Sequence, residues 1–176
     1  MSTFYMVEMH YPLNDDRTKF NEFYNKHISM LLTIDGFRSA QRYECTHEAR
    51  APFLAVYRLR DPGVMTSENY TSRAGPTSVH PAFKAKMTNW DRNLVTGDIE
   101  TMEVADDGWM VLIDRLSAER PHLPKAFTSL TIIGLDTPIA ERGVLIGAEG
   151  EPAIPAEEDG WIVRSFRSIH APRYPG

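Results

Sequence analysis

The sequence has 176 residues, of which 42% are hydrophobic and 24% charged, a composition typical of a folded globular protein. Its net charge of −5 and lack of Lys/Arg clusters exclude a nucleic-acid partner, because phosphate backbones are bound mainly by clustered cations. The single cysteine, Cys45, excludes an intramolecular disulfide and a multi-cysteine metal site. The N-terminal segment lacks signal-peptide features and no apolar stretch could span a bilayer, so we expect a cytoplasmic protein without a membrane partner.

The first strand and the first helix have clear boundaries in the sequence. Residues 4–11 (FYMVEMHY) are rich in strand-forming side chains and stop at Pro12, which cannot donate a hydrogen bond to a neighbouring strand. Asp16 is a suitable N-cap, and Gly36 a suitable stop, for a helix that covers residues 16–34.

One histidine lies on the apolar face of this predicted helix. The residues that recur there at a spacing of three and four are Phe20, Phe23, Tyr24, His27, Leu31 and Ile34. The imidazole of His27 should therefore point toward the core, as either a hydrogen-bonded core group or a catalytic one.

Two strands and a second helical region are expected next. Residues 38–45 and 53–60 have strand character and are close enough in sequence to pair as a hairpin. Asp61 and Pro62 are a suitable N-cap and first position for the helical region that follows.

The first half of the chain predicts an α+β fold. The spacing of Phe83, Met87, Trp90 and Leu94 predicts an amphipathic helix that ends near Gly97, and residues 99–105 can form a further strand. The order over residues 1–105 is then βαββαβ, a ferredoxin-like domain whose antiparallel sheet is backed by helices on one face.

The second half, residues 106–176, has a different pattern. Strands are expected in four apolar segments, namely 107–115, 127–136, 143–147 and 159–167. The first and the last of these segments both open with Asp-Gly-Trp, which is a weak internal sequence similarity. The intervening segments 117–125 and 137–143 can form only short helices, and the Gly-, Pro- and acid-rich segment 147–160 is expected to be an exposed loop. We interpret this half as a degenerate repeat of residues 1–105 that packs on or extends the same sheet.

Part of the first half resembles a known family. The run EFYNKHISMLLTIDGFRSAQRYE, followed by FLAVYRLRDP, is similar to the EthD-like branch of the dimeric α+β barrel superfamily. In those proteins a helix histidine precedes an apolar run, a Pro-Gly-Phe turn and an Arg-Tyr strand. Here Gly36, Phe37, Arg42 and Tyr43 match, while Asp35 stands in place of the proline.

The resemblance covers residues 4–105 and implies a homodimer whose subunits complete a barrel. The segment VHPAF at 79–83 is also similar to the His-Pro segment before the second helix of related stress-responsive barrels. The superfamily includes lactone isomerases without a cofactor, polyketide cyclases, quinol-type monooxygenases and isomerases of aromatic-ring catabolism, so the fold alone does not select a reaction.

Three histidines are candidate catalytic groups. His27 would act as an acid or base inside a pocket whose environment sets its pKa. His80 stands just before Pro81, where the alternative is an exposed turn residue. His10 shares a strand face with Glu8, and the two are either a base with its orienting carboxylate or a half-exposed polar edge.

Four further residues are candidates for substrate binding. Arg42 could hold an anionic substrate, because a guanidinium binds a carboxylate through two parallel hydrogen bonds. Tyr24 and Trp90 suit the core, but Tyr24 lies one turn before His27 and could line the same cavity. Tyr43 is the fourth candidate, because it matches the tyrosine of the Arg-Tyr strand in the family that the chain resembles.

These observations predict an enzyme without a cofactor. The sequence has no Gly-rich nucleotide loop, P-loop, nucleophile elbow or metal-ligand spacing. We predict a cofactor-independent isomerase that moves a proton in a small anionic dienoate or lactone from aromatic-acid catabolism. His27 would be the main base, with His80 or His10 as its partner and Arg42 as the carboxylate clamp. The alternatives are a non-catalytic stress protein that binds a hydrophobic ligand, a cofactor-free or haem-using monooxygenase, and a polyketide-type cyclase.

Overall fold

The computed structural model describes residues 1–12, 14–117, 123–136, 139–150, 152 and 160–176, and the strands in these ranges form one closed antiparallel barrel. The strands are β1 (Ser2–His10), β2 (Phe37–Cys45), β3 (Phe53–Leu59), β4 (Thr88–Gly97), β5 (Trp109–Arg115), β6 (Thr128–Leu135), β7 (Glu141–Gly147) and β8 (Trp161–Ser168). The helical segments are α1 (Arg17–Leu31), the 3₁₀ turn η1 (Pro62–Thr66), α2 (Glu68–Thr71) and α3 (Pro81–Lys84). The predicted α+β class with an antiparallel sheet is confirmed.

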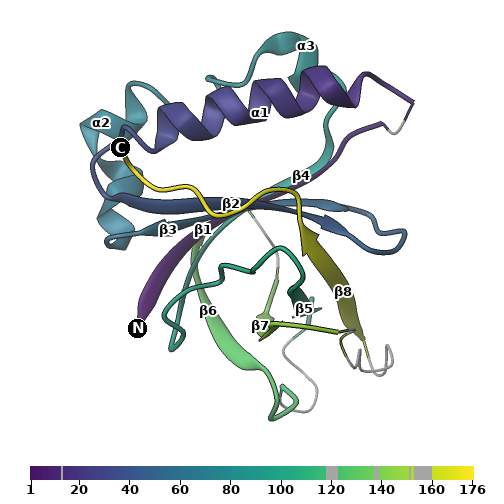
Figure 1. Cartoon of the computed structure of the whole chain (residues 1–176). Coiled ribbons are helices and arrows are strands. Elements are labelled where there is room, and N and C mark those ends of the chain that lie inside the picture. The colour runs from purple at the N-terminus through teal and green to yellow at the C-terminus, as the bar shows by residue number, and fades with distance from the viewer. Residues whose placement is uncertain (13, 118–122, 137–138, 151, 153–159) are drawn as a thin grey trace.

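The barrel is built from two sets of four strands. Neighbours run in the order β4-β1-β3-β2 in the first set and β8-β5-β7-β6 in the second, and the sets join at β2–β8 and β4–β6. Figure 1 shows α1 across the outer face of the first set and the second set beneath it. Both joins lie within one chain, so the edges that an open sheet would expose are paired without a second subunit. The predicted homodimer stays a prediction.

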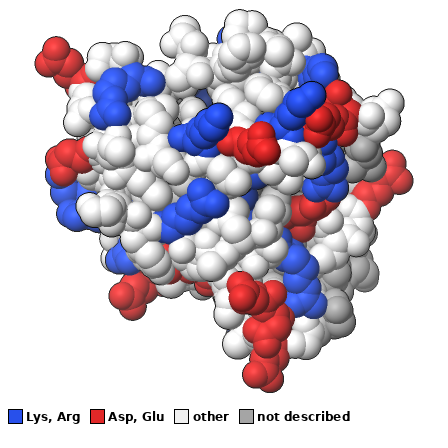
Figure 2. All heavy atoms as spheres, turned by 45° about the horizontal axis from the view of Figure 1, so that its top comes forward, with Lys and Arg blue, Asp and Glu red and all other residues white. Residues whose placement is uncertain are grey.

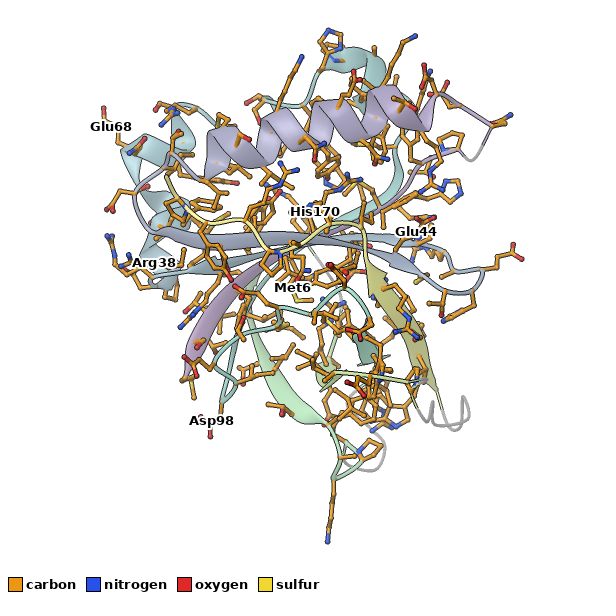
Figure 3. All side chains as sticks on the ribbon, in the orientation of Figure 1. Met6, Arg38, Glu44, Glu68, Asp98 and His170 are labelled. Carbon is orange, nitrogen blue, oxygen red and sulfur yellow. The ribbon has the colours of Figure 1, made fainter. Side chains whose placement is uncertain are left out.

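Alternation along β1 separates two cores. Phe4 and Met6 point into the barrel, whereas Tyr5, Val7 and Met9 point toward α1. Figure 3 shows Met6 on the barrel side of the first strand set. The barrel interior is therefore filled with side chains, as expected for eight strands, and the layer between α1 and the sheet forms a separate core.

The helix α1 begins and ends close to the predicted positions. The Asp16 carboxylate accepts a hydrogen bond from the backbone N–H of Lys19 at 3.1 Å, as an N-cap does. After the helix, Gly36 has a φ of +98°, and a Cβ at this position would lie 2.3 Å from a methyl group of Val64. Only glycine combines this backbone conformation with so close an approach of η1.

The predicted helix from Phe83 to Gly97 is wrong. Helix α3 covers only Pro81–Lys84, and residues 88–97 form β4, which pairs with β1. The segment TNWDRNLVTG contains β-branched and other weak helix formers, and its alternation sends Leu94 to the α1 core and Val95 into the barrel. Three short helical segments, η1, α2 and α3, therefore stand where a helical region after Asp61 and a further helix up to Gly97 were expected.

The predicted strand at 99–105 is also wrong. This segment is irregular, and its backbone pairs with a side chain instead of a strand. The Gln41 amide donates to the Val104 carbonyl at 2.8 Å and accepts from the Val104 N–H at 2.9 Å.

All four strands predicted in the second half are present. The two Asp-Gly-Trp segments lead into β5 and β8, which lie side by side in the same strand set. The predicted short helix at 137–143 is wrong from Glu141 onward, because β7 begins there and pairs with β5. Much of the predicted helix 117–125 and loop 147–160 lies outside the described residues. No helix in the described part of the chain has the length and hydropathy needed to cross a membrane.

Candidate active site

The helix α1 encloses an aromatic cavity against the outer face of the first strand set. Its walls are formed by Tyr5, Val7, Phe23, Tyr24, His27, Leu31, Tyr57, Tyr70, Gly75, Val79 and Trp90. The cavity has a volume of about 20 Å³, which is room for a molecule the size of one water. The structure thus brings together three of the predicted site residues, Tyr24, His27 and Trp90.

His27 is the only wall residue of this cavity, among those described, that could exchange a proton near neutral pH. Burial lowers the pKa of its imidazole to about 4, so the ring is uncharged at neutral pH and can accept a proton. The ring stacks on Phe23 at a centroid distance of 5.9 Å and meets Tyr24 edge-on at 6.0 Å. No hydrogen bond joins the His27 ring nitrogens to another described residue, and the side chain is only part-buried, so the nitrogens are open to a ligand.

Phenol side chains form much of the remaining wall. The rings of Tyr5 and Tyr57 stack with centroids 5.6 Å apart, and Tyr70 meets Tyr5 edge-on at 6.4 Å. The Tyr24 hydroxyl lies 3.1 Å from the sulfur of Met9. Burial raises the pKa values of Tyr5, Tyr24 and Tyr57, so these phenols remain neutral and present aromatic faces and O–H donors.

Arg42 lies behind this wall rather than in it. Its guanidinium carbon is 4.3 Å from the centroid of the Tyr24 ring, and Nη1 donates to the Asn21 side chain at 3.0 Å. Its Nη2 is buried and has no hydrogen-bond partner in the described part of the chain. Burial lowers the pKa of Arg42, but the guanidinium remains charged at neutral pH. It therefore places a positive charge directly against Tyr24.

The other two predicted catalytic histidines do not line the cavity. His80 is exposed and caps α3, with its ring nitrogen accepting from the Ala82 N–H at 3.2 Å. The rings of Phe83 and Phe23, stacked at 4.6 Å, continue the aromatic series from His80 to His27. His10 ends β1, and its Nδ1 lies 3.4 Å from the Thr88 hydroxyl.

Tyr43 belongs to the barrel interior, on the opposite face of the sheet from His27. Its hydroxyl lies 2.7 Å from both the Gln41 side-chain oxygen and the Met102 carbonyl. This tyrosine is thereby fixed to the irregular segment after β4.

A second and larger cavity, of about 310 Å³, opens at one end of the barrel. At its base, Glu8 pairs with Arg142 and Arg164 rather than with His10. Burial alone would raise the pKa of Glu8, but the two arginines outweigh it and lower the pKa to about 2. The wall residue His47 accepts a hydrogen bond from the Ser165 N–H at 3.1 Å. Neither group is poised to take a proton from a substrate, so the smaller cavity is the better candidate for catalysis.

Sequence reasoning missed Tyr5, Tyr57 and Tyr70 as wall residues. Tyr5 and Tyr57 lie on the sheet face that α1 covers, and two-residue alternation gives their strand faces but not which face the helix covers. Tyr70 lies in α2, which was expected only as part of an undivided helical region.

The outer surface over α1 carries charges of both signs. Figure 2 shows Lys and Arg side chains interspersed with Asp and Glu across this face, without a continuous field of either sign. The surface around the candidate site thus provides no large electrostatic patch to steer a substrate.

The sequence matches no protein-family model and no curated protein sequence. Two solved structures share the fold. A protein described as anthrone oxidase-like has a TM-score of 0.63 and 12% identity, over 99% of this chain and 94% of that chain. A "putative monooxygenase" from Lactobacillus acidophilus NCFM has a TM-score of 0.56 and 10% identity, over 100% of this chain and 98% of that chain.

These neighbours confirm an α+β barrel fold, and they contradict the predicted function. Their descriptions name an oxidase and a monooxygenase, so the cofactor-independent isomerase predicted from the sequence is wrong. The monooxygenase alternative agrees with them better.

Proposed function

We propose that this protein is an oxygen-dependent oxidase or monooxygenase that acts on a planar, electron-rich aromatic compound with an activated CH₂ group, of the anthrone type. The observation that carries the proposal is the uncharged imidazole of His27 in a cavity walled by phenols and an indole. The descriptions of the two structural neighbours support the same class of reaction.

The proposed reaction uses the substrate itself as the source of electrons for dioxygen. A base removes a proton from the activated CH₂ group, and the resulting carbanion transfers an electron to O₂. The radical pair combines to form a C–O bond, and protonation gives a hydroperoxide. The hydroperoxide then loses its remaining C–H hydrogen and its terminal OH group as water, which breaks the O–O bond and leaves a carbonyl. The balance is one CH₂ group and one O₂ consumed, and one C=O group and one H₂O formed.

His27 is the base in this proposal. A histidine with a pKa of about 4 is a weak base by itself. Once it has taken the proton, however, the substrate anion beside it stabilises the imidazolium, because opposite charges attract strongly in the low dielectric of the site. The charge of Arg42, 4.3 Å from the Tyr24 ring, adds to the stabilisation of negative charge on the substrate.

The aromatic wall would hold a flat ring. Tyr5, Tyr57 and Tyr70 offer stacking faces, and Trp90 has a buried indole N–H without a partner among the described residues. That N–H can donate to a phenolic or carbonyl oxygen of the substrate. Exclusion of water protects the carbanion and the radical pair from protonation and escape.

The closed cavity of about 20 Å³ is too small for such a ring, so the substrate enters when part of the wall moves. The wall residues outside α1 and the sheet are Tyr70 of α2 and, in the segment that follows it, Gly75 and Val79; this segment leads into the four-residue α3. Displacement of this segment opens the site without breaking any strand pairing.

We also propose the finer family and domain assignment. The order β4-β1-β3-β2 supports a ferredoxin-like unit over residues 1–105, of the EthD-like dimeric α+β barrel type. The same order in β8-β5-β7-β6 supports a degenerate repeat over residues 106–176 that takes the place of a partner subunit in the barrel. Outside the barrel, a homodimer remains part of the proposal.

An oxygen electrode tests the proposed function. Purified protein is incubated with anthrone, and oxygen uptake is compared with formation of anthraquinone by absorbance, before and after dialysis against a chelator. We expect one O₂ consumed for each quinone formed, with unchanged rate after dialysis. Turnover of anthrone without oxygen uptake, or no turnover of any anthrone tested, would overturn the proposal.

A further inference from the structure

The cavity at the end of the barrel has the size and lining of a small-molecule site. Its volume of about 310 Å³ lies at the lower end of the range for such sites. Apolar side chains form one part of its wall, namely Ala51, Leu116, Ile139, Ile162 and Val163. Leu116 and Ile162 are among the exposed large hydrophobic residues of the chain, so the apolar wall continues to the surface.

The base of this cavity is a closed ring of four buried charges. Arg142 bonds to Glu8 and, at 2.6 Å, to Asp114. Arg164 bonds to the same two carboxylates at 2.7 and 2.9 Å. These four groups satisfy each other's charge, so the base is rigid and electrically balanced.

One carboxylate above this ring has no partner. Asp91 lies directly opposite Glu8 in the pairing of β1 with β4 and lines the cavity. No hydrogen bond or ion pair joins the side chain of Asp91 to another residue in the described ranges. Burial and the nearby charge of Glu8 raise the pKa of Asp91, as expected for a carboxylate that lacks a cation.

A second polar group without a partner lies in the wall near Asp91. The Arg164 side chain is only 7% exposed and lines the cavity, and its Nε has no hydrogen-bond partner in the part of the chain that is described. Buried polar groups normally have partners, so the unpaired Nε in the same wall as Asp91 indicates a bound polar group.

The charges around the cavity favour a cation. Because the four charges of the ring balance each other, the remaining charged groups of the wall are the carboxylates of Glu48 and Asp91 and the guanidinium of Arg50. Arg50 is already engaged, since its Nε donates to the Asn89 side chain at 3.0 Å, although its charge slightly lowers the pKa of Asp91. No cluster of three or more His, Cys, Asp or Glu among the described residues could hold a metal ion, so an organic cation fits better.

We propose that this barrel-end cavity binds a small apolar amine that carries an oxygen acceptor next to its ammonium group. The ammonium group pairs with the Asp91 carboxylate, and the neighbouring oxygen accepts a hydrogen bond from Arg164 Nε. The apolar body of the amine packs on Leu116, Ile139 and Ile162.

Titration with phenylalaninol, followed by amide chemical shifts of the labelled protein, tests this site. We expect saturable shifts at residues of the barrel end, such as Ala51, Leu116 and Ile162, and none around Phe23 and His27. Phenylethylamine, which lacks the hydroxyl, should bind several-fold more weakly, and 3-phenylpropanol, which lacks the amine, at least about tenfold more weakly.

The variant Asp91→Asn should weaken phenylalaninol binding at least about tenfold while leaving 3-phenylpropanol unchanged, because it removes only the charge. Asp98→Asn, an exposed carboxylate at the end of β4, serves as the matched control and should bind like the native protein. The proposal is overturned if phenylalaninol causes no shifts at about 10 mM, shifts the α1 cavity instead, or binds Asp91→Asn equally well.

Discussion

The imidazole of His27 lies almost parallel to the ring of Phe23, with centroids 5.9 Å apart and planes inclined by 22°. This stacking orients the imidazole, and no hydrogen bond joins either ring nitrogen to another described residue. The nitrogens are therefore available to a substrate, and burial keeps the ring uncharged. This arrangement suits a histidine that acts as a base.

The first prediction concerns catalysis by His27. His27→Asn should lower kcat on an anthrone substrate by about a hundredfold or more, the usual loss for one acid or base, while the melting temperature changes by only a few degrees. His80→Asn is the matched control, because His80 is exposed and asparagine also caps helices. Equal decreases in kcat in the two variants would show that His27 is not the catalytic base.

The second prediction concerns the pH dependence of stability. The unfolded chain protonates a histidine near its ordinary pKa of 6.5, whereas burial keeps folded His27 uncharged down to about pH 4. The unfolded state therefore binds more protons in this window, and the free energy of unfolding falls as the pH decreases from 6.5 to 4. Urea unfolding of the native protein should show a loss of up to about 3 kcal/mol that His27→Gln lacks. Parallel pH profiles of the two proteins would contradict the proposed burial.

The third prediction concerns the ring of buried charges in the barrel. Arg142→Met leaves Glu8 and Asp114 with only Arg164 between them and should destabilise the fold by about 3–5 kcal/mol. Arg60→Met, which removes an exposed pair with Asp35, should have almost no effect on urea unfolding. Similar stabilities for the two variants would show that the ring does not hold the barrel interior together.

The fourth prediction separates backbone strain from steric clash at glycines. Gly36→Ala combines a φ of +98° with a close approach to Val64 and should cost about 3 kcal/mol or more. Gly75→Ala has a φ of +97° but open space around it, and should cost about 1 kcal/mol. Gly134→Ala has neither feature and should be nearly neutral in thermal unfolding. Any other order of the three melting temperatures would contradict the described geometry.

The first part of the fold could be predicted because its signals are local. Pro12, the Asp16 cap and the Gly36 stop lie within a few residues of the elements that they delimit, and the structure places β1 and α1 accordingly. The spacing of Phe83, Met87, Trp90 and Leu94 imitates a helix, whereas β4 is selected by its pairing with β1, about 80 residues away.

The candidate site and the ring of buried charges in the barrel were predictable only in part for the same reason. His27 and Tyr24 belong to one helix face, so their spacing shows that they are neighbours. Glu8 and Arg142 are 134 residues apart, and no sequence pattern connects them. Their pairing depends on the closure of the barrel, which no local signal in the sequence encodes.

The central claim is that dioxygen supplies the oxygen atom of the product, and isotope labelling tests it most directly. The protein is given anthrone under ¹⁸O₂ in ordinary water, and the quinone is examined by mass spectrometry, with His27→Asn in parallel. The account predicts one ¹⁸O atom in each newly formed carbonyl, at a rate that falls about a hundredfold in the variant. Turnover that continues without oxygen, or a product whose new oxygen comes from water, would contradict it.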